Sequence, residues 1–360
     1  MIDSMKTTIR TASLGLIAAG PLLSGSAPAD AADPQAWIDD QVGSNETLSI
    51  SAGWVPKGEV EYFGAGPMDA DAQTPVDAAT RYQIGSLTKA FTHLLLAEMA
   101  EVGAVGYDTT VADLIGERVE FANPDVGRIT LLELATHTSG LPRLPANLAF
   151  DEPADPYAGY GEDDLLAAIA SARHKQPLGD HYAYSNFGAG LLGYLLGRVD
   201  GGGYAGALTE RVLGPLGLAA TGFDPEDRRA AGFSGGEVVP DWTFDAMAGA
   251  GALWSSAEDL VRLARFMLGL SAHRLEHALD ADREVIEPEA NGYAVTRVWH
   301  VAESPDGPVY WHNGGTSGFQ SFFGFRPATD DAVVLLVAGK ADATEAGMRW
   351  LDATPGDAPE

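Results

Sequence analysis

Strand-like segments stand at both ends of this chain and helix-like segments fill its middle, an order that leaves few ways to build one core. Residues 47–54 and 59–64 carry β-branched and aromatic residues and are divided by a Pro-Lys-Gly turn, so they predict a hairpin. Further strands are predicted at 293–301, 309–312, 320–325 and 332–337, followed by a helix at 343–351. This order favours a single sheet assembled from the two termini, with the middle inserted as a second lobe.

The middle of the chain is predicted to be mostly helical. Apolar residues recur at helical spacing from Ser86 until two glycines, at 103 and 106, stop the pattern. More helices are predicted at 131–136, 163–172, 186–199, 204–212 and 257–267.

We therefore expect an α+β fold, in which an antiparallel sheet built from both chain ends is flanked by helices. Residues 32–106 and 271–351 would form this α/β lobe, and residues 107–270 the inserted, mostly helical lobe. The polar tail at 352–360 is expected to be disordered. A functional site is expected in the crevice between the lobes.

The composition excludes several classes of function. The chain has 360 residues, of which 46% are hydrophobic, enough for a substantial core. It carries 22 Lys and Arg against 51 Asp and Glu, a net charge of −29 that repels phosphate backbones, so nucleic acid is not expected as a partner. We interpret the acidity as a strongly solvated surface. The absence of cysteine excludes disulfides, thiol catalysis and cysteine-ligated metal, and we expect neither a cofactor nor a metal.

The N-terminus has the three regions of a secretory signal peptide. Lys6 and Arg10 precede the apolar residues 14–23, and a small-residue cleavage site follows at 29–31. We expect residues 1–31 to be removed and the protein to be secreted or periplasmic. The apolar part is too short to span a bilayer, so stable membrane insertion is not expected and a retained anchor is the weaker alternative.

Three motifs have an ordinary structural explanation. Residues 232–236 match G-x-S-x-G, but the nucleophile elbow of that form needs a strand before it and a helix after it, so a glycine loop is favoured. The glycines at 201–206 match G-x-G-x-x-G without a preceding strand, which favours a turn. His273 and His277 have the spacing of one helix face, yet no third ligand is evident, so solvent-facing histidines are favoured.

Ser86-x-x-Lys89 has a context that fits chemistry. Positions i and i+3 share a helix face, so the lysine amine can reach the serine hydroxyl. The backbone N–H groups at a helix N-terminus favour negative charge on an attacked carbonyl oxygen. A lysine in low dielectric loses proton affinity and can accept the serine proton. On its own, however, the pattern is more typical of an N-capping serine with a snorkelling lysine.

Two later segments complete a three-part pattern. Tyr184 and Asn186 form a Y-x-N element at the start of a predicted helix, and residues 312–314 form an H-x-G element at the edge of a predicted strand. In this order the elements resemble the signature of the serine beta-lactamase and penicillin-binding protein superfamily, in its class C-like branch. That branch includes class C beta-lactamases, D-alanyl-D-alanine carboxypeptidases, D-aminopeptidases and esterases. Segments 131–142, 214–218 and 251–260 are similarly family-like.

The resemblance implies a role for each matched residue. Ser86 would attack an acyl carbonyl and form an acyl-enzyme, while Lys89 and Tyr184 share the proton transfers. The backbone N–H groups of Ser86 and Gly315 would form the oxyanion hole. Asn186 would hold Lys89 and the substrate, and Tyr184 would activate the water that releases the acyl group. In the family-like segment 131–142, the resemblance implies a structural role for the histidine at 137.

The third element departs from the lysine-threonine-glycine form of the family's beta-lactamases. His312 and Asn313 stand in its first two places, and a histidine is a poorer permanent counter-charge for a substrate carboxylate than a lysine. If the charge of His312 assists binding, activity should change at roughly pH 6 to 7. Asn313, Gly314 and Thr316 are further expected substrate contacts, and Thr316 and Ser317 would partly replace the missing threonine hydroxyl.

The expected function is an exported serine acyl hydrolase. Its substrates would be small esters or D-amino-acid amides and peptides, with weak or no beta-lactamase activity. The alternative is a non-catalytic or penicillin-binding envelope protein that recognises peptidoglycan stem peptides. Retention of Ser86, Lys89, Tyr184 and Asn186 favours catalysis, because binding alone does not require a nucleophile next to a base.

Overall fold

A computed structural model describes residues 33–43, 45, 47–69, 74–149, 155–173, 178–179, 181–290 and 293–352. The predicted signal peptide and nearly all of the polar tail lie outside these residues. The helices are α1 (Pro34–Val42), α2 (Thr88–Glu101), α3 (Val111–Ile115), α4 (Pro124–Arg128), α5 (Leu131–Ala135), α6 (Glu162–Ser171), α7 (Asn186–Asp200), α8 (Gly203–Leu208), α9 (Gly214–Leu216), α10 (Ala257–Met267), α11 (His277–Arg283) and α12 (Ala343–Trp350). The strands are β1 (Ser49–Val55), β2 (Glu61–Ala65), β3 (Arg81–Gln83), β4 (Phe233–Ser234), β5 (Glu237–Val238), β6 (Trp254–Ser256), β7 (Glu287–Ala290), β8 (Tyr293–Val295), β9 (His300–Ala302), β10 (Val309–Gly315), β11 (Phe319–Arg326) and β12 (Asp331–Ala338).

The main sheet joins the two ends of the chain. In the described residues it has the strand order β2-β1-β12-β11-β10-β9-β8-β7, and each neighbouring pair is antiparallel. The N-terminal strand β1 pairs with the C-terminal strand β12 from Ser49 opposite Ala338 to Val55 opposite Ala332. The expected α+β fold, with a sheet built from both termini, is confirmed.

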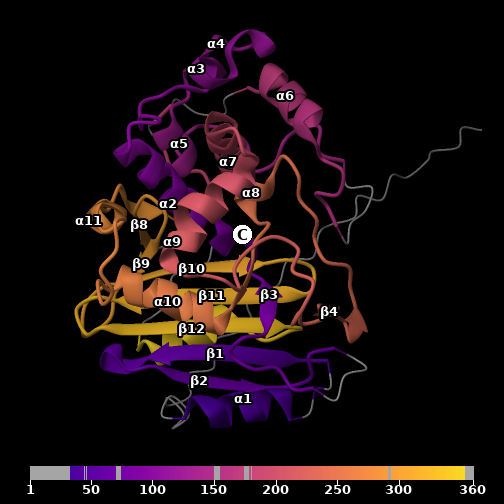
Figure 1. The fold of residues 1–360 in the computed structure, drawn as a ribbon, viewed down its shortest axis with the longest axis vertical. Helices are drawn as coiled ribbons and strands as arrows, with labels where there is room; N and C mark the ends of the chain where they lie inside the picture. Colours follow the sequence, from indigo (N-terminus) through magenta and orange to yellow (C-terminus); the bar gives the residue numbers. More distant parts are fainter. Residues whose placement is uncertain are drawn as a thin grey trace, which may run out of the picture.

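Helices cover both faces of this sheet, and Figure 1 shows α10 in front of the nearer one. On β12, Val333, Leu335 and Val337 pack into a core with α1 and α12, whereas Val334 and Leu336 pack into the larger core with α10 and α2. Side chains of a strand alternate between faces, so a strand covered on both sides needs an unbroken apolar run. The sequence Ala-Val-Val-Leu-Leu-Val-Ala of this strand meets that need.

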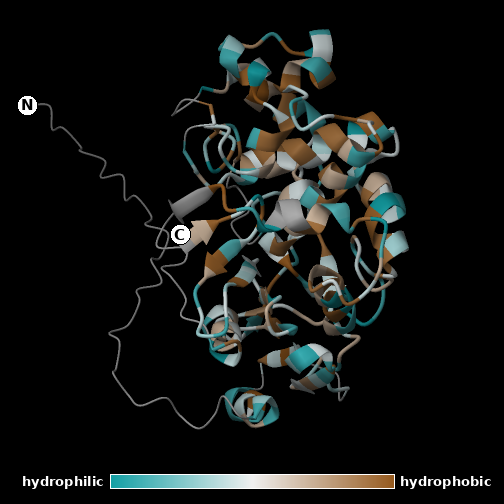
Figure 2. Ribbon diagram, turned by 90° about the vertical axis from the view of Figure 1, so that its left-hand side faces the viewer, coloured by the Kyte–Doolittle hydropathy of each residue, from teal (hydrophilic) through white to brown (hydrophobic). Residues whose placement is uncertain are grey.

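Helices α3 to α8 of the middle segment gather above the sheet in Figure 1, whereas α10 of the same segment lies against the sheet. Figure 2 shows brown, apolar residues along the upper helices. At their centre, α7 packs closely on α8, and glycine at 197 makes this approach possible. A Cβ at Gly197 would lie only 2.1 Å from the backbone nitrogen of Tyr204. The segment is not wholly helical, since it contains the hairpin β4–β5, and β6 pairs with β3. The division into two lobes at residues 106 and 270 stays a prediction.

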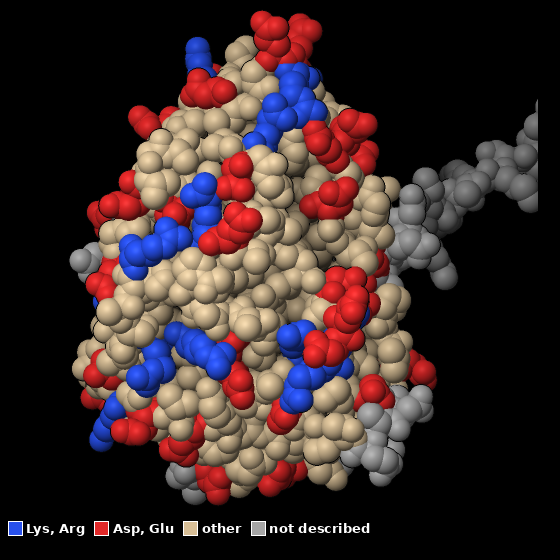
Figure 3. Space-filling view, viewed as in Figure 1, with Lys and Arg blue, Asp and Glu red and all other residues tan. Residues whose placement is uncertain are grey.

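The surface agrees with the acidic composition. On the face drawn in Figure 3, acidic side chains are spread from end to end and the basic ones lie among them. No helix of the described residues is long and apolar enough to cross a membrane.

Candidate active site

Ser86 lies in a short 3₁₀ turn, Gly85–Leu87, between β3 and the start of α2. Gly85 has φ of 51°, in the left-handed region that favours glycine. A Cβ at Gly85 would lie 2.6 Å from the nitrogen and 2.7 Å from the oxygen of Gly315. Only a glycine therefore lets the end of β10 approach the turn that carries Ser86, which brings the two expected oxyanion donors to the same place.

Lys89 is buried one turn further along, with 5% of its surface exposed. Its Nζ lies 3.0 Å from Ser86 Oγ and donates a hydrogen bond of 2.7 Å to the backbone oxygen of Ala250. Burial, and then the charge of Arg143, hold the pKa of Lys89 well below its usual value of 10.5. The lysine is thereby biased towards the neutral amine, which can take a proton from the serine.

Tyr184 reaches the same serine from the loop before α7. Its hydroxyl interacts with the side chain of Ser86, and Lys89 Nζ lies 4.9 Å from the centroid of its ring. Burial raises the pKa of Tyr184 above its ordinary value of 10, although the interaction with Ser86 and the charge of Arg143 oppose the rise. The phenol therefore keeps its proton at neutral pH and can donate it. The structure thus brings Tyr184 to Ser86 and Lys89, from a segment nearly a hundred residues further along the chain.

His137 supports this arrangement. Its Nδ1 accepts a hydrogen bond of 3.2 Å from the backbone nitrogen of Ser185, and its ring centroid lies 4.5 Å from that of Tyr184. Burial lowers the pKa of His137 well below 6.5, and the charge of Lys89 adds to this effect. A neutral ring that accepts from the backbone beside Tyr184 fits the structural role expected for His137.

Asn186 begins α7 beside Tyr184, with Ser185 as the N-cap of the helix. Its Nδ2 donates to the hydroxyl of Tyr157 at 3.0 Å. Its Oδ1 is buried and has no hydrogen-bond partner among the described residues. Such an oxygen needs a donor, which a substrate amide or the amine of Lys89 can supply.

His312 lies on β10 close to the same centre, with its ring 6.4 Å from that of Tyr184 and 5.2 Å from that of His300. Its pKa is lowered from 6.5 to about 4, chiefly by burial and also by the charge of Lys89, while a hydrogen bond with the Asn313 oxygen opposes the shift. His312 is therefore neutral at pH 6 to 7. The expected titration in that window is wrong, because the histidine is buried.

The alternation of β10 also corrects one expected contact. The side chain of Asn313 donates to the hydroxyl of Thr344 on α12 at 3.0 Å. It therefore points to the face of the sheet opposite His312, away from Ser86, since successive side chains of a strand alternate.

The remaining expected contacts on this strand lie as follows. A Cβ at Gly314 would lie 1.9 Å from the backbone oxygen of Ile84, so close approach again requires glycine. The hydroxyl of Thr316 is buried without a partner among the described residues. Ser317 Oγ accepts a hydrogen bond of 2.7 Å from the indole of Trp242.

An aromatic wall beside the site was missed by the sequence analysis. Tyr157 stacks on Phe244 at 4.8 Å and meets Trp242 edge-on at 5.5 Å. A Cβ at Gly251 would lie 3.1 Å from the Phe244 ring and 3.8 Å from the carbonyl carbon of Gly85, so this wall stands next to the nucleophile's turn. The alternating Trp-Thr-Phe at 242–244 is the signal that could have indicated it.

The family model described as Beta-lactamase matches residues 35–354. This chain belongs to the Beta-lactamase family. Members of this beta-lactamase fold are serine hydrolases, and the arrangement around Ser86 is consistent with that chemistry.

Solved structures share the fold of this family member. A class C beta lactamase from Rhodobacter sphaeroides is 24% identical with a TM-score of 0.75, over 89% of this chain and 97% of that one. A Beta-Lactamase/D-Alanine Carboxypeptidase from Pseudomonas syringae is 19% identical with a TM-score of 0.75, over 88% and 97%. An octameric penicillin-binding protein homologue from Pyrococcus abyssi is 22% identical with a TM-score of 0.76, over 88% and 75%.

Curated relatives match this Beta-lactamase family chain over part of their length. Protein flp of Staphylococcus aureus (strain MRSA252) is 25% identical over 286 residues, which are 76% of this chain and 56% of that protein. Unguisins hydrolase ungD' of Aspergillus campestris (strain IBT 28561) is 26% identical over 287 residues, 72% of this chain and 53% of that protein. The chain thus spans little more than half the length of these relatives.

The other motifs lie elsewhere in this family member. Residues 232–236 contain the short strand β4 and the two-glycine turn that joins it to β5, with Ser234 exposed and no helix following, so they form no nucleophile elbow. His273 and His277 each bond to the backbone of their own turn, and the described residues hold no group of three or more His, Cys, Asp or Glu that could bind a metal.

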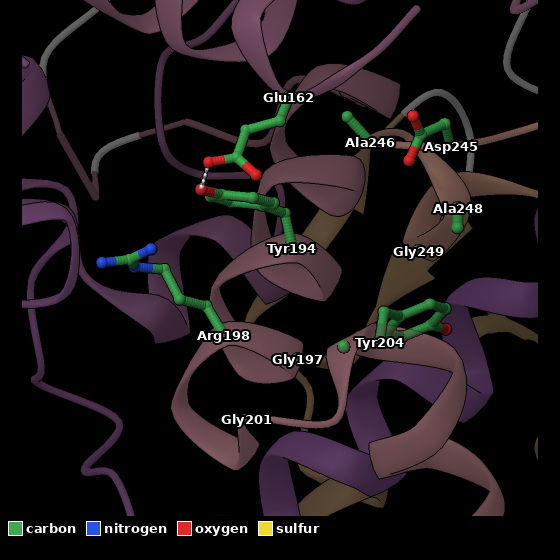
Figure 4. A pocket seen from close by; sticks show the side chains of 11 residues that line it. Glu162, Tyr194, Gly197, Arg198, Gly201, Tyr204, Asp245, Ala246, Ala248 and Gly249 are labelled. Carbon is green, nitrogen blue, oxygen red and sulfur yellow. Dashed lines mark hydrogen bonds between the residues drawn. The ribbon is translucent and has the colours of Figure 1, made fainter. Parts of the chain in front are cut away.

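The glycines at 201 and 203 join α7 to α8, as a turn should, and line a hollow of about 410 Å³ (Figure 4). Glu162 and Tyr194 are hydrogen-bonded across one side of it, and Asp245 lies on the other. This hollow contains neither Ser86 nor Tyr184 in its lining. We therefore place the chemistry at Ser86.

Proposed function

We propose that the protein is an exported serine acyl hydrolase that forms an acyl-enzyme on Ser86. Its substrates are small esters or D-amino-acid amides and peptides, and its activity on beta-lactams is weak or absent. One observation carries the proposal: the hydroxyl of Ser86 has the buried amine of Lys89 at 3.0 Å and lies beside the phenol of Tyr184, with which it interacts. A nucleophile with an adjacent base and an adjacent proton donor is the arrangement that acyl transfer requires.

Acylation follows from these contacts. Neutral Lys89 takes the hydroxyl proton of Ser86 as the serine oxygen bonds to the acyl carbon. The carbonyl oxygen becomes negative and accepts hydrogen bonds from the backbone N–H groups of Ser86 and Gly315. When the bond to the leaving group breaks, Tyr184 donates its proton to the departing oxygen or nitrogen and regains one from protonated Lys89.

Deacylation uses the same groups. A water molecule attacks the ester carbon and gives a proton to Tyr184, which passes its own proton to Lys89. Burial keeps the pKa of Tyr184 high, so forming a free phenolate would be costly. A relay in which Tyr184 gains one proton as it loses another avoids that cost. Collapse of the tetrahedral intermediate frees the acid, and Ser86 recovers its proton.

The choice of substrate rests on the third motif. His312 is neutral at pH 7, so it offers no permanent charge for the carboxylate of a beta-lactam. A solved structure titled Beta-Lactamase/D-Alanine Carboxypeptidase and a relative named unguisins hydrolase support acyl substrates beyond beta-lactams. Export, to the periplasm or the medium, is supported by the signal peptide pattern at 1–31.

Steady-state kinetics of the mature protein test the proposal. The substrates are 4-nitrophenyl acetate and butyrate, D-alanine 4-nitroanilide and a fluorescent penicillin. We expect turnover of an ester or an amide, little turnover of penicillin, and complete loss in Ser86→Ala. Unimpaired turnover in Ser86→Ala would overturn the mechanism. A stable penicillin adduct without turnover of any substrate would favour the penicillin-binding alternative instead.

A further inference from the structure

Arg143 lies at the site without a role in the steps above. It stands in the loop between α5 and α6 and is exposed. Its guanidinium carbon lies 5.2 Å from the centroid of the Tyr184 ring. The backbone nitrogen of Phe187 donates to the backbone oxygen of Arg143 at 3.1 Å. This bond ties Arg143 to the start of α7, next to Asn186.

The charge of Arg143 is permanent, whereas the other basic groups near Ser86 are biased towards their neutral forms. Burial lowers the pKa of Lys89, His137 and His312. A guanidinium stays protonated at every working pH. Its field reaches the site, because Arg143 contributes to the lowered pKa of both Lys89 and His137. Of these four described groups, Arg143 is the one with a permanent positive charge, and it stands on the Tyr184 side and not at position 312.

This charge is unusual in its setting. The chain carries a net charge of −29, which repels anions at long range. Arg143, beside the ring of the proposed proton donor, is a local positive charge that attracts anions to the site of this acidic protein. Arginine binds carboxylates through two parallel N–H bonds, which fixes orientation as well as position.

We propose that Arg143 makes the enzyme selective for substrates whose acyl half carries a carboxylate, which pairs with the guanidinium while Ser86 attacks the acyl carbon. We assign the carboxylate to the acyl half of the substrate because Arg143 is hydrogen-bonded to the start of α7, next to Asn186. The buried amide oxygen of Asn186 has no partner among the described residues and can accept a hydrogen bond from the acyl half. The opposite wall, β10, presents the neutral His312. This inference rests on the proposed function.

The test compares activated esters that differ in charge. The first pair is the 4-nitrophenyl monoester of glutaric acid, which is anionic, and 4-nitrophenyl pentanoate, which is neutral and similar in length. The ratio of their kcat/KM values is measured in the parent enzyme, in Arg143→Gln and in Arg143→Lys. The rate with Ser86→Ala is subtracted in each case, since a glutarate monoester also hydrolyses through its own carboxylate.

We expect the parent enzyme to prefer the anionic ester. Arg143→Gln should reduce that preference by about 10- to 100-fold, mainly by raising KM for the anionic ester, because a charged hydrogen bond contributes about one to two powers of ten in affinity. Arg143→Lys should restore most of it, and 0.5 M NaCl should weaken it. Because a ratio is measured, a loss of folded protein common to both esters cancels. An unchanged ratio in Arg143→Gln overturns the inference.

A second pair separates the two halves of the substrate. In 3-carboxyphenyl pentanoate and phenyl pentanoate the carboxylate, when present, lies on the leaving group. We expect the ratio of kcat/KM for these two esters to be the same in Arg143→Gln as in the parent enzyme. If Arg143→Gln lowers this ratio and leaves the ratio of the first pair unchanged, the carboxylate does not belong to the acyl half. If no ester is turned over in a Ser86-dependent way by the parent enzyme, the proposed function itself has failed and the inference falls with it.

Discussion

Burial governs the chemistry of single residues in this site. Lys89, His137, His300 and His312 all have a lowered pKa, and loss of solvent is the main cause for each of them. The spacing of Ser86 and Lys89, supported by the later Y-x-N and H-x-G elements, was enough to predict a lysine of lowered proton affinity. The sequence could not show that His312 is equally buried, because its burial depends on tertiary packing near His137, which comes from a distant segment, and near His300 on the neighbouring strand β9. Neutral bases therefore surround Ser86 at neutral pH.

Replacement of Lys89 by methionine should separate activity from stability. We expect Lys89→Met to slow acylation by about two to four orders of magnitude, because the general base is lost. Below pH 10.5 the unfolded chain binds a proton at this lysine more readily than the folded protein does, so the buried amine lowers stability at pH 7. The variant should therefore gain about 1–2 kcal/mol in free energy of unfolding at pH 7.

Urea denaturation at pH 7 and at pH 10.5 checks this expectation, with Lys340→Met, at an exposed lysine, as the control. The gain of Lys89→Met should shrink at the higher pH, and the control should show none. Equal activity in parent and variant, or a loss of stability in Lys89→Met at pH 7, contradicts the assignment of Lys89 as a buried neutral base.

His312 should make stability fall in acid. Its folded pKa is about 4 against 6.5 when unfolded, so the unfolded state binds more protons between these values. Stability is retained above pH 6.5 and declines as the pH drops towards 4, by at most about 3 kcal/mol for this group. In His312→Gln the decline between pH 6.5 and 4 should be shallower, measured by thermal melts. Identical slopes in parent and variant would show that His312 is not buried as described.

At the scale of elements, long periodic segments were predictable and short ones were not. The hairpin β1–β2, the strands β10 to β12 and the helices α7 and α10 follow from their patterns. The strands β3 and β6 have three residues each, too few for an alternation to be recognised. The helix α1 was missed, although Asp33 caps it and Pro34 begins it. The approach of β10 to the turn of Ser86 is tertiary and has no local signal beyond the glycines.

The contact between Gly85 and Gly315 can be tested with a matched pair of glycines. Gly85 and Gly103 both have positive φ, 51° and 72°, so alanine strains the backbone at either position. A Cβ at Gly103 meets nothing within 4 Å, whereas one at Gly85 collides with Gly315. We expect Gly85→Ala to lower kcat by about 10²–10³-fold by displacing an oxyanion donor, and Gly103→Ala to keep near-parental kcat.

Circular dichroism and thermal melts of both variants accompany these kinetics. Similar losses of stability with a loss of kcat only in Gly85→Ala support the close approach. Parental kcat in a folded Gly85→Ala protein would show that Gly315 is not held against the nucleophile's turn in the working enzyme.

For the whole molecule, the order of segments was the best guide. Strand patterns at both ends predicted one sheet, and β1 does pair with β12. The aromatic wall of Tyr157, Trp242 and Phe244 could not be foreseen, because its members come from loops whose packing depends on the complete fold. The same holds for Glu98 of α2. Its carboxylate is buried and pairs with Arg211 and Arg274, which joins three distant segments.

Loss of this buried charge network should destabilise the whole molecule. Glu98→Gln removes the buried charge between two part-exposed arginines, of which Arg211 keeps its pair with Asp200, and we expect a loss of about 1–2 kcal/mol in the free energy of unfolding. Asp125→Asn, in the exposed pair with Arg128, is the control and should change little. Urea denaturation followed by tryptophan fluorescence measures both. A loss in Glu98→Gln no larger than in the control would mean that the network does not hold these segments together.

The central claim is that the oxygen of Ser86 becomes acylated, with Lys89 and Tyr184 moving the protons. Intact-protein mass spectrometry after rapid mixing with an excess of an activated ester tests this directly. We expect a mass increase of one acyl group, mapped by peptide digestion to Ser86 and absent in Ser86→Ala. Continued turnover with an unmodified Ser86, or an acyl group on another residue, would contradict the account.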